Sequence, residues 1–355
     1  MKKIFLALAA VAALASCSKT DAEYEQTEEI SFAPVAKNIT KSMITGVNFP
    51  KTESFNVWAW YKQVDANTSV ADWAATDNEH MYINEGMFVN QGGTANWKGA
   101  TSYYWPKLGS LLFAGYYPSS VKEQVDYFFN ASENKMVFSN IEQSVVQASG
   151  TTEDLMYFNM ITNSVQSGPV AVEFKHALSW ITVNLSRTSD NAPGVDYPKI
   201  KVNSVTFTKV KPVGTGTVVG TDGVISWNTD AAVAINPVVT PENGVVLTKA
   251  VQKQTEPLFI PQALIPDDKN TTENEAMQLV VNYTIFSSAT EYFTETYSAD
   301  LAGMEGKLKD SSTEELSAWE PAKHYIYNIT IGLDEILIAP TVADWEGVEV
   351  AVPIK

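Results

Sequence analysis

One cysteine and three histidines carry most of the distinctive chemistry in this sequence. Cys17 is the only cysteine, so the chain can form neither an intrachain disulfide nor a site built from several thiolates. His80, His176 and His324 are far apart and belong to no metal-binding motif such as HExxH. A GxSxG elbow and a phosphate-binding glycine loop are also absent from the sequence. We therefore predict a non-enzymatic protein with no catalytic residue, cofactor or metal, although a catalytic carboxylate pair stays open because such residues need to meet only in space.

Acidic residues dominate the charge of the chain. It has 41 Asp and Glu against 24 Lys and Arg, a net charge of -17, which argues against nucleic acid as a partner. Two clusters of acidic residues could bind calcium, but neither has the spacing of an EF-hand loop. We favour solvated loop acids over ion sites for both groups: Asp267, Asp268, Glu273 and Glu275 in one, and Asp65, Asp72 and Asp77 in the other.

The N-terminus has the pattern of an export signal. Residues 1–16 begin with two lysines and continue as a short apolar run, too short to span a bilayer. The sequence Leu-Ala-Ser before Cys17 resembles the lipobox of bacterial lipoproteins, in which the cysteine carries lipid; a free cysteine is the alternative. Residues 17–29 are polar and acidic, and we expect a flexible tether there. The prediction is a surface-exposed protein held on the outer membrane through lipid at Cys17.

The rest of the chain alternates apolar and polar residues with a period of two, which is typical of β-strands. Many short strands between Gly, Pro and Asn turns predict an all-β protein of antiparallel sandwiches. Two domains are expected, over residues 30–166 and 167–355, with a polar linker at the boundary. The best helix signal is short and lies at residues 312–317. Expected strands include residues 55–61, 111–117, 202–210, 245–251, 279–286 and 325–331.

His176 lies where the apolar alternation changes parity. The apolar residues before it include Phe174, and those after it include Ile181 and Val183, on the other parity. A change of parity requires a bulge or a bend near residues 176–180. We interpret His176 as a hydrogen-bonded structural residue at this irregularity, in preference to a ligand or a catalyst.

Aromatic residues make up 11% of the chain, and several lie close together in sequence. Such groups could stack on sugars, which leaves a surface glycan-binding lipoprotein as an alternative function. At alternating strand positions, aromatic residues more often pack in the core. The two groups are Trp58, Trp60, Tyr61 and Trp73, and Tyr103, Tyr104 and Trp105.

Five segments occur in order along the chain: Tyr-Tyr-Trp-Pro at 103–106, Phe-Ala-Gly-Tyr-Tyr-Pro at 113–118, Phe-Lys-His-Ala-Leu-Ser at 174–179, Leu-Phe-Ile-Pro-Gln at 258–262, and residues 325–333 ahead of 342–345. Together they resemble the fimbrillin (Mfa-like) family of Bacteroidales. The resemblance covers nearly the whole chain after about Ile30. It implies a type V pilus subunit with two transthyretin-like β-sandwich domains in tandem, exported as a lipoprotein and polymerised outside the cell.

The resemblance also implies assembly by protease-triggered strand exchange. Residues 29–35 are a plausible removable strand, with Ile30 and Phe32 on one parity. Lys37 and Lys41 follow, at places where family members commonly carry an arginine. The only arginine here is Arg187, so either a lysine is cleaved or the subunit is never processed; exposed loop lysines are the alternative interpretation.

The C-terminal tail, residues 348–355, could be the donor strand. Val348, Val350, Val352 and Ile354 share one face of an extended chain and could enter a groove on another subunit. The alternative is that the tail is the last strand of its own domain. The expected partners are other pilus subunits, the membrane through the lipid, and a host or bacterial surface ligand. A tip or anchor subunit remains an alternative to a shaft subunit.

Overall fold

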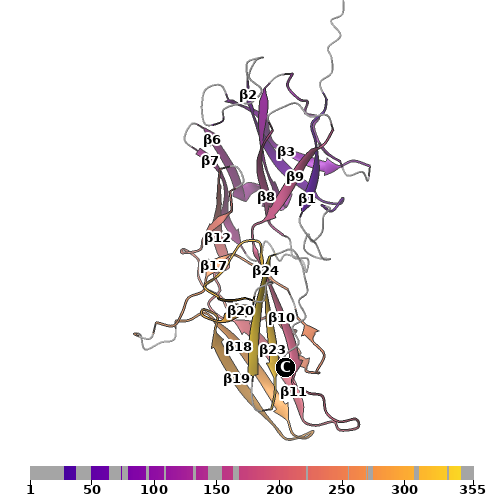
Figure 1. The fold of residues 1–355 in the computed structure, drawn as a ribbon, viewed down its shortest axis with the longest axis vertical. Coiled ribbons are helices and arrows are strands. Elements are labelled where there is room, and N and C mark those ends of the chain that lie inside the picture. The colour runs from indigo at the N-terminus through magenta and orange to yellow at the C-terminus, as the bar shows by residue number, and fades with distance from the viewer. Residues whose placement is uncertain are drawn as a thin grey trace, which may run out of the picture.

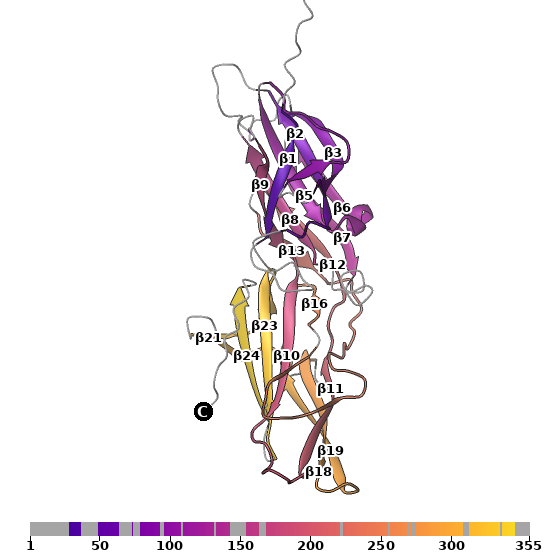
Figure 2. The same ribbon diagram turned by 90° about the vertical axis from the view of Figure 1, so that its right-hand side faces the viewer.

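Strands dominate the computed structural model, and they are arranged in two lobes along the long axis of the molecule (Figures 1 and 2). Among the residues that the structure describes, one short 3-10 helix, η1 (Ser119–Gln124), accompanies them. In the parts of the chain that are described, no helix is long and apolar enough to cross a bilayer. The structure describes residues 28–36, 49–63, 73, 79–92, 96–107, 109–130, 133–142, 154–162, 168–220, 223–254, 256–268, 270, 275–307, 312–333 and 336–344.

The first lobe is built around a closed barrel with the strand order β1-β4-β3-β2-β5-β8-β9. Its interior is filled almost entirely by aromatic and branched side chains, because alternate residues of each strand point inward. The barrel strands are β1 (Ser31–Ala36), β2 (Ser54–Lys62), β3 (Glu79–Asn90), β4 (Trp97–Gly99), β5 (Ser110–Tyr117), β8 (Met156–Thr162) and β9 (Val170–His176).

A four-stranded sheet with the order β13-β12-β7-β6 packs on the outside of this barrel. Strands β12 and β13 come much later in the chain than β6 and β7, and β12 pairs with β7. The shared core includes Trp58 and Trp60 from the barrel and Phe138 from the sheet. The strands are β6 (Val125–Asn130), β7 (Glu133–Glu142), β12 (Val213–Val219) and β13 (Ser226–Asn228).

The second lobe is a sandwich of two sheets around a separate core. One sheet has the order β15-β10-β23-β24-β20-β21, with β16 also paired to β10, and the other has the order β14-β11-β18-β19. The first sheet contains β10 (Ser179–Arg187), β15 (Gln252–Lys253), β16 (Leu258–Phe259), β20 (Glu305–Lys307), β21 (Thr313–Glu315), β23 (Lys323–Ile331) and β24 (Ile336–Asp344). The second contains β11 (Lys199–Phe207), β14 (Val245–Val246), β18 (Gln278–Phe286) and β19 (Tyr292–Asp300), and a small pair is formed by β17 (Gln262–Ala263) and β22 (Ala318–Trp319).

The predicted change of parity at His176 is confirmed as a bend between the lobes. Strand β9 ends at His176 in the barrel, and β10 begins at Ser179 in the sheet of the second lobe. Ala177 donates its backbone N–H to the carbonyl of Leu155, 2.8 Å away, which holds the bend against the barrel. The two apolar parities therefore serve two different cores.

The all-β expectation is confirmed, but the expectation of purely antiparallel sheets is wrong. Strands β1 and β9, β10 and β23, and β20 and β24 pair in parallel, and the first sheet closes into a barrel. The period of two shows which faces are buried but carries no information on strand direction or neighbours. The helix expected at residues 312–317 is also wrong, because Thr313–Glu315 forms β21 and pairs with β20. Tandem transthyretin-like domains stay a prediction, as does the boundary at 166/167.

Candidate strand-exchange site

Strand β1 closes the barrel by lying between two strands that are far from it in sequence. It pairs in parallel with β9, from Phe32 opposite Val170 to Ala36 opposite Phe174. On its other side it pairs antiparallel with β4, where Phe32 lies opposite Trp97. The removable strand expected at residues 29–35 therefore does form a strand, and it is the one that completes the barrel (Figure 2).

The side chains of β1 are part of the barrel core. Ile30 and Phe32 are fully buried, as expected from their shared parity. The ring of Phe32 is surrounded by four other phenylalanine rings, mostly edge to face, with centroids 4.8 to 6.1 Å away. These four are Phe55, Phe88, Phe113 and Phe158. Burial of Ile30 and Phe32 contributes roughly 3 to 6 kcal/mol together.

Polar contacts hold the N-terminal end of β1. Ile30 donates its backbone N–H to the carbonyl of Tyr103 at 2.7 Å, and the N–H of Gly168 donates to the Glu28 carboxylate at 2.6 Å. Glu29 forms an ion pair with Lys98 of β4. The hydrogen bond from Lys98 lowers the pKa of Glu29, and burial opposes it only in part. These contacts define where β1 begins.

Removal of β1 would open the barrel along its length. β9 would keep only its two pairs with β8, at His176 and Lys175, because Val170 to Phe174 pair with β1. The short strand β4 would keep only its pairs with β3. The opening would expose unpaired backbone groups on both sides and an aromatic floor between them. Such a groove suits one extended segment with apolar side chains on one face.

The other residues of the predicted exchange machinery lie outside the described residues. Lys37 and Lys41 follow directly after β1, and Cys17 precedes it. The tail residues Val348, Val350, Val352 and Ile354 follow β24, the last described strand, which ends at Asp344. Their roles stay predictions.

The groove residues were not singled out from the sequence as functional. Phe55, Val57 and Ala59 alternate along β2 and all line the barrel interior, so their parity was a usable signal. The sequence did not show that Phe88, Phe113 and Phe158, which come from three other strands, all pack against Phe32 of β1. Only the closure of the barrel brings them together.

The aromatic residues considered for sugar stacking are mostly in the core. Trp58 and Trp60 are each only 5% exposed, and Trp60 packs against Tyr127 and Phe129 of β6. Trp105 is buried as well, whereas Tyr104 is exposed. A platform that includes Trp60 is therefore wrong, because the outer sheet covers it.

The two histidines that are buried both have structural environments. His176 Nδ1 lies 2.6 Å from Asp154 Oδ2, which agrees with the interpretation of His176 as a hydrogen-bonded structural residue. His324 stacks on Trp180 with ring centroids 3.5 Å apart, and its Nε2 lies 2.8 Å from the Thr182 hydroxyl. Burial lowers the pKa of His324 to about 3, with a smaller effect from Lys253. Among the described residues, no group of three or more His, Cys, Asp and Glu could hold a metal ion.

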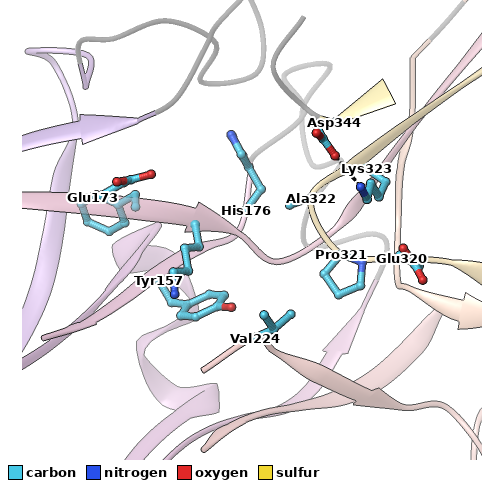
Figure 3. Close-up of a pocket in the computed structure, with 11 residues that line it drawn as sticks. Tyr157, Glu173, His176, Val224, Glu320, Pro321, Ala322, Lys323 and Asp344 are labelled. Carbon is cyan, nitrogen blue, oxygen red and sulfur yellow. Dashed lines mark hydrogen bonds and ion pairs between the residues drawn. The ribbon is translucent and has the colours of Figure 1, made fainter. Parts of the chain in front are cut away.

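A cavity of about 520 Å³ lies at the junction of the lobes, beside the end of β9 where its pairing with β1 stops. β1 pairs with β9 as far as Phe174, and Phe174, Lys175 and His176 line the cavity. Figure 3 shows the ion pair of Lys323 and Asp344 on the side that belongs to the second lobe. The cavity is thus bounded by both lobes.

Comparison with known proteins decides the family. A family model described as fimbrillin-like matches residues 18–345, which is most of the chain. The chain belongs to the fimbrillin-like family. This confirms the resemblance seen in the sequence, and the family is one of structural fimbrial proteins. No curated protein matches this fimbrillin-like chain.

Solved structures that are similar to this chain include two fimbrial proteins. A fimbrial protein from Bacteroides vulgatus is 14% identical with a TM-score of 0.49, and the match covers 90% of this chain and 100% of that one. The tip fimbrial protein Mfa3 from Porphyromonas gingivalis, with a C-terminal truncation, is 12% identical with a TM-score of 0.42, and the match covers 90% and 100%. The family assignment of this fimbrillin-like chain rests on the family model.

Proposed function

We propose that this fimbrillin-like protein is a subunit of a type V pilus that assembles by strand exchange and contributes to adhesion. The observation that carries the proposal is the position of β1. It is the first of the described strands, it closes the barrel, and Phe32 fills the centre of an aromatic core. Its loss would create the kind of groove that accepts a strand from another chain.

The proposed pathway begins with export and ends with polymerisation. The protein is exported as a lipoprotein, with lipid on Cys17 holding it to the outer membrane and residues 17–29 as a tether. A trypsin-like protease then cleaves after Lys37 or Lys41, immediately beyond β1. The cleaved N-terminal piece, including β1, leaves the barrel, and the subunit enters the fimbrium. Strand exchange is proposed in the first lobe, whose barrel includes β9 although β9 follows the predicted boundary at 166/167.

The donor is proposed to be residues 348–355 of another subunit. Val348, Val350, Val352 and Ile354 would face the aromatic floor, while the backbone pairs with β9 and β4. Burial of four such side chains would contribute roughly 6 to 12 kcal/mol before the cost of ordering the tail. This exceeds the roughly 3 to 6 kcal/mol of Ile30 and Phe32, and the difference would help to offset the cost of ordering and associating the tail.

The test is limited proteolysis of the mature-length protein with trypsin, followed by N-terminal sequencing and electron microscopy. We expect cleavage after Lys37 or Lys41 and the appearance of polymers. Matched variants are Lys37→Gln with Lys41→Gln, which should resist this cut, and a chain shortened by residues 348–355, which should be cut and stay monomeric. Cleaved wild-type protein that remains monomeric would contradict the shaft role.

A tip or anchor role is separated from the shaft role by processing in cells. A shaft subunit should lose the residues up to Lys37 or Lys41, whereas an anchor should keep its lipid and β1. Membrane fractionation of a Cys17→Ser variant tests the lipid itself. Retention of that variant in the membrane would contradict lipidation at Cys17.

A further inference from the structure

Strand β19 (Tyr292–Asp300) is the longest strand that ends an open sheet in the described parts of the chain. It is nine residues long and lies at the end of the order β14-β11-β18-β19. The other strands that end the sheets of four or more strands are shorter: β14 and β15 have two residues each, β13 and β21 have three each, and β6 has six. Figures 1 and 2 place β18 and β19 at the far end of the second lobe. One whole side of β19 therefore offers backbone N–H and C=O groups for pairing.

This edge has no bulge, proline or basic residue to protect it, and its only charge inside the strand is Glu295. β18 and β19 pair residue by residue from Gln278–Asp300 to Phe286–Tyr292, without a bulge. The nine residues of β19 include no Lys, Arg or Pro. Charged side chains, proline and bulges are the common means of preventing an added strand. The edge is regular and accessible.

Aromatic side chains are exposed along β19. Phe293 lies opposite Ile285, and Tyr297 lies opposite Val281, so both are on the face that carries the core. Phe293 is nevertheless 51% exposed and Tyr297 38%, and neither is part of the buried core of this lobe. Tyr292, on the other face, is 64% exposed. An added strand would cover apolar surface on both faces as well as pair with the backbone.

The charge of the edge decides which partner fits. Glu291 and Glu295 are exposed, Asp300 ends the strand, and residues 286–300 contain no basic side chain. A second copy would bring the same carboxylates together across the pair, in a protein with a net charge of -17. A strand with Lys or Arg beside its apolar positions would instead meet opposite charge. The tail of this chain is a poor candidate, since residues 345–355 carry acidic residues and a single lysine at the end.

We propose that β19 is a docking edge for a basic, extended segment of another protein, which adds to the sheet as a fifth strand. Apolar side chains of the segment would pack on Phe293 and Tyr297, and a Lys or Arg would lie near Glu295. The barrel groove and β19 are in different sheets, so this interaction does not depend on strand exchange. It would let a subunit bind a further protein while its barrel is engaged.

The test uses the full chain as bait for a displayed library of nine-residue peptides. We expect enriched peptides to alternate apolar residues with Lys or Arg. Synthetic versions should bind in fluorescence anisotropy and protect the amides of β19 in hydrogen exchange. A Phe293→Thr and Tyr297→Thr double variant should weaken binding at least tenfold, and Glu295→Lys should weaken it severalfold and reduce its dependence on salt.

Matched controls distinguish specific docking at β19 from nonspecific binding and from misfolding. Phe128→Thr removes an aromatic residue that is 41% exposed on the shorter edge strand β6, and it should leave binding unchanged. Circular dichroism and melting temperature should show that every variant is folded. The proposal is overturned if no enriched peptide depends on β19, if the double variant binds as tightly as wild type, or if sedimentation shows that β19 pairs two copies of the chain.

Discussion

Strands β1 and β19 differ in how their two edges are paired. β1 is paired on both sides and closes the barrel, with Ile30 and Phe32 fully buried. Among the described strands, β19 is paired on one side only, and Phe293 and Tyr297 are partly exposed. A strand held on both sides can be replaced only after it is released, whereas a strand held on one side can accept a neighbour directly. The first lobe is therefore suited to the exchange of a strand, and the second lobe to the addition of a strand beside β19.

The sharpest test of this contrast compares two phenylalanines. Phe32→Ala should lower the free energy of unfolding by about 3 to 5 kcal/mol, because it leaves a cavity among four phenylalanine rings. Phe293→Ala is the matched control and should cost under about 1 kcal/mol, since the side chain is half exposed. Guanidinium unfolding of both variants measures the difference. Equal losses would show that β1 is no more important to the fold than β19.

Acid should weaken the sheet of the second lobe through His324 on β23. Its pKa is lowered to about 3 by burial, against about 6.5 in an unfolded chain. The folded state thus favours neutral His324; this contribution is complete above about pH 6.5 and is lost as the pH falls towards 3. Between pH 7 and pH 5, wild type should lose about 2 kcal/mol that His324→Gln does not lose. Denaturant titrations at both pH values measure this loss. An equal loss of unfolding free energy in wild type and His324→Gln would contradict the prediction.

A smaller effect is expected at the N-terminal end of β1. Lys98→Gln removes the ion pair with Glu29, which is partly exposed, and should cost under about 1 kcal/mol at low salt and less at high salt. Lys107→Gln, on an exposed turn, is the control. Thermal unfolding at two salt concentrations compares them. A loss of several kcal/mol in Lys98→Gln would mean that charge, and not the aromatic core, holds β1 in place.

The smallest change in stability is expected at the β19 edge. Glu295→Lys should alter the free energy of unfolding by about 0.5 kcal/mol or less, because the side chain is exposed. It should nevertheless lower the concentration at which the protein begins to aggregate, because it removes one of the carboxylates that repel a second copy at this edge. Light scattering on a concentration series measures this. Unchanged aggregation together with an unchanged fold would indicate that the edge is already protected.

Local patterns predicted much of the fold. The alternation at residues 55–61 predicted the strand β2, and its neighbouring residues Val57 and Trp58 enter two different cores. The change of parity around His176 indicated the bend between β9 and β10. Both predictions succeed because side-chain direction in a strand depends on the backbone of that strand alone.

Other predictions failed where the outcome depended on distant partners. Thr313–Glu315 pairs with β20 instead of forming a helix, since three or four residues have too weak a local preference to resist a neighbouring strand. Trp60 had the composition expected of a sugar platform, yet β6 covers it. Neither outcome could be read from nearby residues.

The sequence by itself determined the strand-rich class, the apolar faces, the acidic charge and the family of this protein. The tertiary structure alone decided that β1 lies between β4 and β9 and that four phenylalanines from separate strands surround Phe32. It also decided that β19 ends its sheet, with no neighbour on one side among the described strands. The physical reason is that side-chain alternation is a local property of one strand, whereas pairing, closure and exposure depend on which strands meet.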